Sequence, residues 1–503
     1  MDFLRFKSIN RVLLALNIVM SIIYFVCIII VFPMGSPVLF ALLVLSEVFH
    51  VWQVFGFIHT IWPRKIQHKF DAWFRPKVAI FITVCGEPKE IIAQTVRAAL
   101  AMQYTNHTVY ILNDGRVANR SNWKEAEEIA ERFGIQCITR TEPGGAKAGN
   151  INNALRQTDE PYIVVFDADH APKKNFLLAM MGYFVDKRVG YVQSPQYYKN
   201  FNTNQVSAGA WDQQALFFGP LLKGKDSLGS TFMCGTNMAI RRQAIEQVGG
   251  MNEKSIAEDF LTSILIHDKK WRSVYVDQVL AEGLAPEDFL SYYKQQFRWA
   301  RGSLEVLFSQ NPIVKKGLTT SQKIQYLASA SFYLTGIIVL INIMLPLLYF
   351  FFGLQPHAIS TMTLALVFLP YIFIIIYTLQ LSSNFTYTFR ALSFSLSSFP
   401  IHIKAFWHTI LRKQNGFAVT SKKRLSGNFA YLVWPHLLFI AAVIAGVIVG
   451  VIREGWSASL ISNLAWAGLY VAIFSPFIQA AFEKQKAKVI EEKTSSIKQE
   501  AGV

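Results

Sequence analysis

Apolar runs at both ends of the chain frame a middle part in which polar and apolar positions alternate more finely. The first run, 12–32, carries no charged residue and is long enough to cross the roughly 30 Å of hydrocarbon in a bilayer. Five further apolar runs lie at 37–58, 327–352, 359–381, 429–452 and 460–482. Runs of this length with almost no charge predict six membrane-spanning helices rather than the core helices of a soluble protein.

The middle of the chain alternates between short β-branched runs and amphipathic stretches. Strands are expected at 78–84, 107–112, 135–139 and 162–166, and helices at 90–102, 121–132 and 146–156. Such an order predicts an α/β fold, with a mostly parallel sheet covered by helices on both faces. Ligands of these sheets bind beyond the carboxyl ends of the strands, so polar residues at those ends are the first candidates for a functional site.

The distribution of charge adds an orientation. Only 16% of the 503 residues are charged, against about 25% in soluble domains. The net charge is +16, and the segment 382–428 holds seven Lys and Arg residues and no acid. Because basic residues stay on the cytoplasmic side of the plasma membrane, both termini, the middle part and this segment are expected in the cytoplasm. Anionic lipid explains the positive charge, and no nucleic-acid-binding motif accompanies it.

These patterns divide the chain into six segments. We expect two spans in 1–62, a cytoplasmic α/β domain with interfacial helices in 63–325, two spans in 326–382, a cytoplasmic interfacial segment in 383–428, two spans in 429–482 and a cytoplasmic tail in 483–503. An even number of spans places both termini on one side of the membrane, which agrees with the orientation expected from the charges.

Acidic residues stand at the ends of two expected strands. Asp114 follows the strand at 107–112, and Asp167 and Asp169 follow the strand at 162–166. Two carboxylates at a strand end suit Mg²⁺ or Mn²⁺, which usually takes one or two protein carboxylates together with phosphate oxygens of a substrate. An isolated Asp-x-Asp is more often a solvated turn or a helix cap, but its place at a strand end favours a metal here.

A helix expected at 287–308 carries a second group of candidates. Gln295 and Trp299 are four residues apart and share a face, with Arg298 beside them. A guanidinium can hold a pyrophosphate through two hydrogen bonds, and an indole can stack on the apolar face of a sugar ring. A core Trp with a surface Arg explains the same pattern equally well when it is taken alone.

Glu258 and Asp259 open the helical run 260–267. A carboxylate near a helix N-terminus is favoured by the helix dipole, so both residues could serve only as caps. In the functional interpretation, Asp259 is a general base that takes a proton from an acceptor hydroxyl. The spacing alone does not decide between the two.

Seven motifs in one order resemble those of the processive family 2 glycosyltransferases, most closely the cellulose synthase-like branch. In chain order the matching segments are Asn113-Asp114-Gly115, Gly145–Asn150, Asp167-Ala168-Asp169-His170, Phe232–Thr236, Ala257-Glu258-Asp259, Gln295–Trp299 and Phe417–Lys422. The resemblance covers roughly 78–424, with spans on both sides. It implies an α/β GT-A glycosyltransferase domain with a mostly parallel sheet, embedded in a six-helix transmembrane protein.

The sequence departs from the family pattern at three places. Asn113 stands where the family has an Asp, and Ala257 stands where it has a Thr. After Arg424 the chain returns to the membrane, so no C-terminal cyclic-di-GMP-binding β-barrel is expected within this chain. Both departures leave the neighbouring acidic residues, Asp114 and Asp259, in place.

The resemblance also implies a role for each motif. Asp259 is expected to be the catalytic base, and Asp169 is expected to bind Mg²⁺ or Mn²⁺. The residues expected to bind the donor nucleotide are Asp114, Lys147, Asp167, Asp169, Gln295 and Arg298. Cys234 and Trp299 are expected to contact the acceptor, and a gating loop over the donor is expected to contain Phe417, Val419, Thr420 and Lys422.

The implied activity is processive, inverting transfer from a UDP-sugar to a growing polysaccharide, which is translocated across the membrane. Glucose is favoured because the gating loop and acceptor segment look cellulose synthase-like, and the product could be cellulose, a β-1,3- or mixed-linkage glucan, or a capsular β-glucan. A chitin- or hyaluronan-type synthase, a non-processive lipid-linked glycosyltransferase and a nucleotide-regulated transporter remain alternatives. Accessory secretion subunits and self-association stay open.

Overall fold

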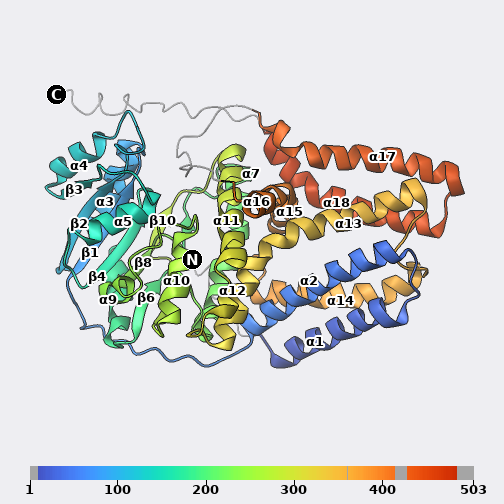
Figure 1. Cartoon of the computed structure of the whole chain (residues 1–503), viewed down its shortest axis with the longest axis horizontal. Helices are drawn as coiled ribbons and strands as arrows, with labels where there is room; N and C mark the ends of the chain where they lie inside the picture. The colour runs from blue at the N-terminus through green and yellow to red at the C-terminus, as the bar shows by residue number, and fades with distance from the viewer. Residues whose placement is uncertain (1–8, 360, 414–427, 484–503) are drawn as a thin grey trace, which may run out of the picture.

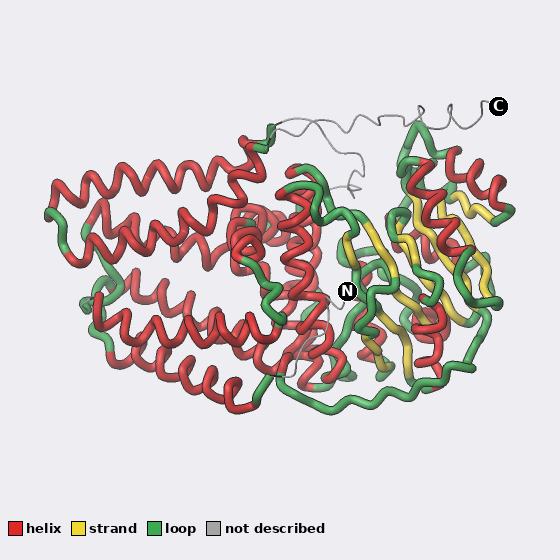
Figure 2. The backbone as a smooth tube through the Cα atoms, turned by 180° about the vertical axis from the view of Figure 1, so that it is seen from behind, coloured by secondary structure: helices red, strands yellow, loops and turns green. Residues whose placement is uncertain are grey.

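The structure, a computed structural model, describes residues 9–359, 361–413 and 428–483. Figure 1 shows a sheet with its helices at one end of the molecule and long helices at the other, and Figure 2 shows the same division from behind. The helices α11 (Phe289–Ser309) and α12 (Thr320–Ser331) lie between the two parts. The chain is therefore built as an α/β part joined to a helical part.

Seven strands form one sheet in the order β3-β2-β1-β4-β8-β6-β9. Neighbouring strands run parallel except β8, which is antiparallel to β4 and β6. The strands are β1 (Val78–Val84), β2 (His107–Asn113), β3 (Gln136–Thr139), β4 (Tyr162–Asp167), β6 (Val189–Gln193), β8 (Met238–Arg241) and β9 (Arg272–Tyr275). The expectation of a mostly parallel sheet is confirmed, and the four expected strands lie within one residue of their bounds.

The strand β1, which lies between β2 and β4, is buried along its whole length, since helices cover both faces of the sheet. The helices on one face are α3 (Lys89–Leu100), α4 (Glu125–Phe133) and α6 (Phe176–Met181), and those on the other are α5 (Ala146–Leu155), α9 (Arg242–Glu246) and α10 (Glu258–Asp268). A strand buried on both faces must be apolar throughout, which is why VAIFITV shows no alternation.

The helix α4 begins at Glu125, four residues later than the amphipathic pattern predicts. Residues 121–124 form turns instead. The side-chain amide of Asn122 donates to the carbonyls of Gly86 and Glu87 at 3.3 and 3.4 Å, so this segment holds the loop after β1 rather than continuing the helix. Asn favours such local bonds over a helix interior.

A second, three-stranded sheet joins the segment after β4 to the chain before α11. Its order is β5 (Ala171–Pro172), β10 (Ala281–Gly283) and β7 (Tyr197–Tyr198). The strand β5 pairs antiparallel with β10, and β10 pairs parallel with β7. This pairing brings the chain just beyond β10 next to the Asp-x-Asp motif.

Six helical stretches of the described residues are long and apolar enough to cross a membrane, as expected from the sequence. They are Arg11–Val31, Pro37–Ile61, Thr320–Phe352, Met362–Ser382, Ala430–Glu454 and Ala458–Phe482. The helices in them are α1 (Arg11–Val26), α2 (Pro37–Ile61), α12 with α13 (Thr335–Phe352), α14 (Thr361–Ser382), α17 (Trp434–Glu454) and α18 (Ala458–Phe482). The chain is a multi-pass membrane protein.

The third stretch is the longest because the more polar α12 continues through a short turn into α13. The sequence pattern placed the start of this span at 327, where the apolar run begins, whereas the helical stretch begins at Thr320. In Figure 1, α12 lies at the end of this stretch nearest the sheet. Short 3-10 or π turns complete the helices at Cys27–Val31, Gly182–Val185, Phe217–Leu221, Pro312–Val314, Phe332–Leu334 and Ala430–Val433.

Four further helices pack where the two parts meet. They are α7 (Gln205–Leu216), α8 (Leu222–Ser227), α15 (Phe389–Ser397) and α16 (Phe399–Ile410). The helix α11 packs along α16, and α7 packs against α15. Buried aromatic residues from both parts, among them Phe289, Tyr292, Phe394 and Phe477, form one cluster there. Because this core is shared, the sheet is fixed against the membrane helices through α11.

Candidate active site

The carboxyl ends of β1, β2 and β4 form one edge of the sheet. In the register of these strands, Val84 pairs with Asn113 and Thr83 pairs with Asp167. The chain leaves β1 toward β2 on one side, while β4 lies on the other, which is the kind of switch point where α/β sheets bind ligands. The structure therefore brings Asp114 and Asp167 to one edge, as the sequence predicts.

Asp167, Asp169 and His170 form a group that suits a divalent cation. One ligand atom of each lies within 4.8 Å of the others. The side chains of Asp169 and His170 are buried, whereas that of Asp167 is 36% exposed. The amide of Leu284, beyond β10, donates to Asp169 Oδ2 at 3.2 Å and orients that carboxylate. Two carboxylates suit Mg²⁺ or Mn²⁺, and the imidazole is a further donor to which the sequence gave no role.

Lys147, near the start of α5, connects two sides of this site. Its Nζ forms an ion pair with Asp167 and donates to the carbonyl oxygen of Gly235 at 2.7 Å. Burial by itself would raise the pKa of Asp167, but the charges of Lys147 and His170 outweigh burial and hold that pKa below its ordinary value. Asp167 is therefore ionised at neutral pH.

Asp114 is buried and paired with a cation that the sequence analysis missed. Arg140 Nε and Nη2 donate to the two carboxylate oxygens of Asp114, each at 2.7 Å. Arg140 also donates to the carbonyls of Gly144 and Ala146, so the guanidinium is held from both sides. Burial raises the pKa of Asp114, and Arg140 opposes this. The one feature of the sequence that could have indicated this pair is the position of Arg140 directly after β3, because β3 is the neighbour of β2, which ends just before Asp114.

Asn113 has a structural place in the loop after β2. Its Oδ1 accepts from the amide of Gly115 at 2.9 Å, and its Nδ2 donates to the carbonyl of Trp123 at 2.9 Å. The side chain is fully buried. An Asn can both donate and accept in this position, whereas an ionised Asp could only accept. The Asn that replaces the Asp of the family pattern therefore makes two hydrogen bonds within this loop, one as acceptor and one as donor.

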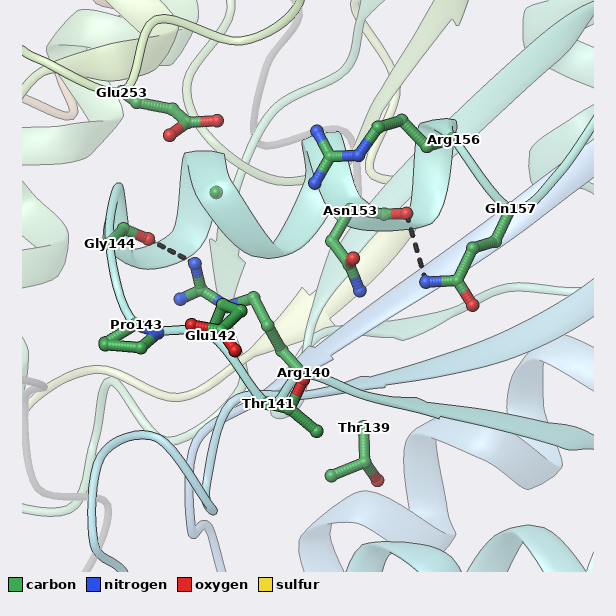
Figure 3. Close-up of a pocket in the computed structure, with 11 residues that line it drawn as sticks. Thr139, Arg140, Thr141, Glu142, Pro143, Gly144, Asn153, Arg156, Gln157 and Glu253 are labelled. Carbon is green, nitrogen blue, oxygen red and sulfur yellow. Dashed lines mark hydrogen bonds between the residues drawn. The ribbon is translucent and has the colours of Figure 1, made fainter.

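A polar pocket of about 260 Å³ opens beside this edge, and Figure 3 shows its lining. The pocket lies between the loop after β3 and one side of α5, with Glu253 across from Arg140. Gly149 of the Gly145–Asn150 motif lines it, but none of the residues to which the sequence analysis assigns a role does. Only Arg140 belongs both to the lining and to the Asp114 pair, so the pocket borders the candidate site without forming it.

Asp259 lies in the first turn of α10 and faces Gly235 of the segment Phe232–Thr236, which the family resemblance assigns to the acceptor and which we call the acceptor segment. Its Oδ1 accepts from the amide of Phe260 at 2.7 Å, so Oδ2 is the oxygen that faces Gly235. A Cβ at Gly235 would lie 3.1 Å from Asp259 Oδ2 and 3.7 Å from Lys147 Nζ. Gly235 also has a φ of +80°, a left-handed conformation that favours glycine.

The neighbouring acids Glu258 and Asp259 are both harder to ionise than isolated carboxyl groups. Burial, followed by the charge of Asp259, raises the pKa of Glu258 to about 7. Burial also raises the pKa of Asp259, against the Phe260 amide and the charges of Lys147 and Arg298. The two groups titrate as a pair. A carboxylate with a raised pKa is a stronger base, which suits Asp259 for proton transfer.

The acceptor segment Phe232–Thr236 is held on several sides. The amide of Cys234 donates to Gln193 Oε1 at 2.9 Å, and Gln196 Nε2 donates to the carbonyl of Cys234 at 2.7 Å. At its far end, Thr236 Oγ1 accepts from the amide of Asp167 at 3.0 Å. Burial and the charge of Asp259 raise the pKa of Cys234, so its thiol stays neutral. The segment is thus bonded directly to the end of β4 that carries Asp167.

The helix α11 brings the third group of candidates to the same place. It begins after Asp288, whose side chain accepts from the amide of Ser291, so the helix starts two residues later and ends one residue later than the sequence predicts. Gln295 is buried, while Arg298 and Trp299 are partly exposed. The charge of Arg298 acts on both acids of α10, which places its guanidinium close to them. The expected gating-loop residues, Phe417, Val419, Thr420 and Lys422, lie outside the described residues.

Comparison with known families identifies two overlapping matches. Residues 76–302 match the family described as "Glycosyltransferase like family 2", and residues 246–478 match the family "Cellulose synthase". Together the two matches run from the first strand of the sheet to the last membrane helix. Together they include all candidate residues discussed above. Lys147 and the Asp-x-Asp motif lie in the first match, Trp299 lies in both, and the loop segment Phe417–Lys422 lies in the second.

Individual relatives agree with the family matches. The chain is 28% identical over 460 residues to the UDP-forming cellulose synthase catalytic subunit of Pseudomonas fluorescens strain SBW25, covering 86% of this chain and 61% of that protein. It is 33% identical over 294 residues to the corresponding subunit of Xanthomonas axonopodis pv. citri strain 306, covering 56% of this chain and 40% of that protein. The chain therefore spans less than two thirds of either relative.

Among solved structures, the mannosyltransferase of Pyrobaculum calidifontis in complex with GDP-Man and Mn²⁺ matches with a TM-score of 0.46 and 16% sequence identity. The match covers 79% of this chain and the whole of that protein. A score this low does not by itself establish a common fold. The site described above consequently stands on the contacts within this chain.

Proposed function

The chain belongs to the cellulose synthase-like family 2 glycosyltransferases, and on that premise we propose that it is a processive, inverting glycosyltransferase. It transfers sugar from a UDP-sugar, with UDP-glucose as the expected donor, to a growing β-glucan and moves the product across the plasma membrane. The names of the relatives, UDP-forming cellulose synthase catalytic subunits, support UDP as the leaving group and glucose as the sugar.

Gly235 is the point where donor-side and acceptor-side groups converge, and this convergence carries the proposal. Lys147 Nζ donates to the Gly235 carbonyl and pairs with Asp167, and Asp259 Oδ2 lies near the same glycine. A diphosphate held near Asp167 and Lys147 would present its sugar to the oxygen of Asp259. Groups at this spacing suit glycosyl transfer, which needs an anchored leaving group and a base on opposite sides of the sugar.

A divalent cation fits the donor side. Asp167, Asp169 and His170 offer two carboxylates and an imidazole within reach of one ion, and Lys147 offsets the charge of Asp167. When bound, Mg²⁺ or Mn²⁺ would supply positive charge to a diphosphate leaving group. Arg298 of α11 acts on the two acids of α10, and its guanidinium suits two oxygens of a phosphate.

The chemical step follows from the position of Asp259. The acceptor hydroxyl gives its proton to Asp259 Oδ2 as its oxygen bonds to C1 of the donor sugar, and the bond from C1 to the UDP oxygen breaks. Attack from the face opposite UDP inverts the anomeric carbon, so an α-linked donor gives a β-linked product. The raised pKa of Asp259 strengthens it as proton acceptor.

Asp114 is the proposed contact to uracil, and Arg140 orients it. Both Asp114 oxygens accept from Arg140, yet each keeps a second lone pair that a uracil N–H can use. Holding the carboxylate rigid before the nucleotide arrives lowers the entropy cost of binding. Arg140 therefore acts through Asp114 rather than on the nucleotide itself.

The proposed product path begins at Trp299, where an indole can stack on the terminal acceptor sugar. Because α11 packs against α16 and shares a core with α18, this sugar would enter the membrane part directly. The orientation we propose follows the basic residues, with the sheet, both termini and the segment 383–428 in the cytoplasm. Those basic residues would rest against anionic lipid.

The segment Phe417–Lys422 is proposed to close over the donor and exclude water. Thr420 and Lys422 bring a hydroxyl and a cation, which suit a diphosphate, while Phe417 and Val419 suit docking into a cleft. Replacing Phe417, Val419 and Thr420 together by Ala should reduce synthesis severely without loss of UDP binding. If the variant polymerises normally, the loop has no gating role, and the interpretation that remains is a segment held at the membrane by anionic lipid.

The activity is tested with purified protein in detergent or nanodiscs. UDP release is measured with UDP-glucose, UDP-N-acetylglucosamine and UDP-glucuronate in the presence of Mg²⁺ or Mn²⁺, followed by linkage analysis of any polymer. Release of UDP with UDP-glucose and formation of an insoluble β-glucan is the expected result. Polymer only from the other sugars would identify a chitin- or hyaluronan-type synthase, and a single sugar on lipid would identify a non-processive transferase.

A further inference from the structure

A chain of buried hydrogen bonds connects α12, at the membrane side, with the start of the acceptor segment. Tyr326 Oη lies 2.7 Å from His267 Nδ1, and His267 Nε2 lies 3.2 Å from Tyr191 Oη. Tyr191 Oη in turn donates to the carbonyl oxygen of Thr231 at 2.6 Å. Thr231 is the residue before the acceptor segment Phe232–Thr236, so this series of hydrogen bonds ends four residues before Gly235, which Asp259 faces.

All members of this chain are shielded from water, and their bonds are mutually consistent. Tyr326, His267, Tyr191 and Thr231 are each at most 1% exposed. Burial lowers the pKa of His267 to about 3, so the ring is neutral and carries one N–H. With the proton on Nε2, Tyr326 donates to Nδ1, and the Nε2–H group is shared between Ser273 Oγ at 3.0 Å and Tyr191 Oη at 3.2 Å, while Tyr191 donates to Thr231. This tautomer satisfies the three bonds at once.

His267 also connects to the base through its own helix. It lies in the last turn of α10, and Asp259 lies in the first, about 12 Å away along the axis. Ser263, between them, links the helix to the acceptor segment: the amide of Met233 donates to Ser263 Oγ at 2.8 Å, and Ser263 Oγ donates to the carbonyl of Asp259 at 2.7 Å. The Ser263 side chain thus connects the first turn of α10 to Met233 in the acceptor segment.

We propose that Tyr326 and His267 are positioning residues, which set from the membrane side the distance between Asp259 and the acceptor segment. The inference rests on the proposed function, since it assigns this segment to the acceptor. A misplacement of about 1 Å at a reacting centre can cost about 10²-fold in rate, so a fixed connection to α12 matters for transfer. In the proposed function, donor binding depends on Asp167 and Lys147, which take no part in this series of hydrogen bonds.

The first test is Tyr326→Phe, which removes one hydroxyl and keeps the ring. Polymer formation should fall about tenfold, whereas UDP affinity with Mn²⁺, measured by calorimetry, should stay within about twofold. Hydrolysis of the donor, which releases UDP without adding a sugar to the polymer, should fall less than polymer formation. The ratio of sugar incorporated to UDP released should therefore decrease. A merely destabilised protein would lose both in proportion and keep the ratio. Tyr191→Phe should give the same change, and the double variant should not add to it.

The matched control is Tyr349→Phe. Tyr349 is buried in α13 of the same helical stretch and donates to Glu454 at 2.8 Å, far in sequence from the acceptor segment. This variant also loses one buried Tyr hydroxyl, but the ratio of polymer to UDP should not change. An equal decrease in Tyr349→Phe and Tyr326→Phe would overturn the positioning role.

Amide hydrogen exchange separates this inference from the proposed function. Exchange of the amides in 231–236 should become about tenfold faster in Tyr326→Phe and stay unchanged in Tyr349→Phe. Unchanged exchange in Tyr326→Phe would overturn the inference whatever the activity. If the wild-type protein releases no UDP from any UDP-sugar, the proposed function is wrong, and an altered exchange would still establish the connection from α12 to this segment.

Discussion

Replacing Asp259 by Asn removes the proposed base and hardly changes the shape of the side chain. In the structure, Asp259 Oδ1 accepts from the amide of Phe260, so the Asn carbonyl oxygen would take this place and the NH₂ group would stand where Oδ2 faces Gly235. The acceptor hydroxyl would then meet a donor in place of a proton acceptor. General base catalysis is typically worth about 10²–10⁴ in kcat, or about 2.7–5.5 kcal/mol.

The assay is UDP release under saturating donor, with UDP affinity measured separately by calorimetry. Affinity should stay within about threefold, since the donor-side residues Asp167 and Lys147 are unchanged. The matched control is Glu258→Gln, which removes a neighbouring buried acid. With a pKa of about 7, Glu258 is already half protonated at neutral pH, so this variant should lose less than about tenfold. A rate near wild type for Asp259→Asn, or an equal loss for Glu258→Gln, would refute the assignment.

The pH dependence gives an independent check on the same residue. Asp259 can accept a proton only when ionised, and burial raises its pKa. The rate should therefore fall as the pH is lowered through this raised pKa, at a higher pH than the ordinary Asp value of about 3.9 would give. An acid limb at the ordinary value would show that the carboxylate is better solvated than the structure indicates.

The remaining predictions concern the donor and acceptor sides. Asp169→Ala should abolish the gain in UDP affinity on adding Mn²⁺, and unchanged calorimetry with metal would make the Asp-x-Asp motif structural. Arg140→Leu leaves the Asp114 charge buried and unpaired, which should cost about 3–5 kcal/mol of stability in thermal or chemical unfolding and weaken UDP binding; equal stability would contradict the pairing. Trp299→Ala should shorten the polymer more than it slows UDP release, as seen by size analysis. Without metal, UDP affinity should fall between about pH 6 and 8 as Glu258 loses its proton, and a flat profile would contradict its raised pKa.

Local pattern was enough to predict the first four strands of the sheet, β1 to β4, but not β6, β8 and β9. The β-branched run at 78–84 and its partners are buried by helices on both faces, so their sequence carries a continuous apolar signal. The family matches together with this sheet and the six long apolar helices confirm the expected α/β glycosyltransferase domain in a membrane protein. The prediction was less accurate where side chains compete with the helix, as at Asn122, and where α12 extends the third span.

Pairings between distant residues could not be predicted in this way. Arg140 meets Asp114 across two neighbouring strands, and His267 meets Tyr326 from another helix 59 residues later. No periodicity along the chain records such contacts, because they depend on the order of strands and on how α12 packs against α10. The strand order places the end of β3 beside Asp114, so Arg140 could be found only once that order was known.

Charge balance explains why one arrangement serves both binding and chemistry. The candidate active site gathers four carboxylates and two cations, namely Asp167, Asp169, Glu258 and Asp259 with Lys147 and Arg298. A UDP-sugar brings further negative charge, so these groups alone would repel it. Lys147 neutralises Asp167, and the raised pKa of Glu258 keeps that acid partly protonated. In the proposed function, the charges of Asp169 and of the diphosphate would then be balanced by the divalent cation.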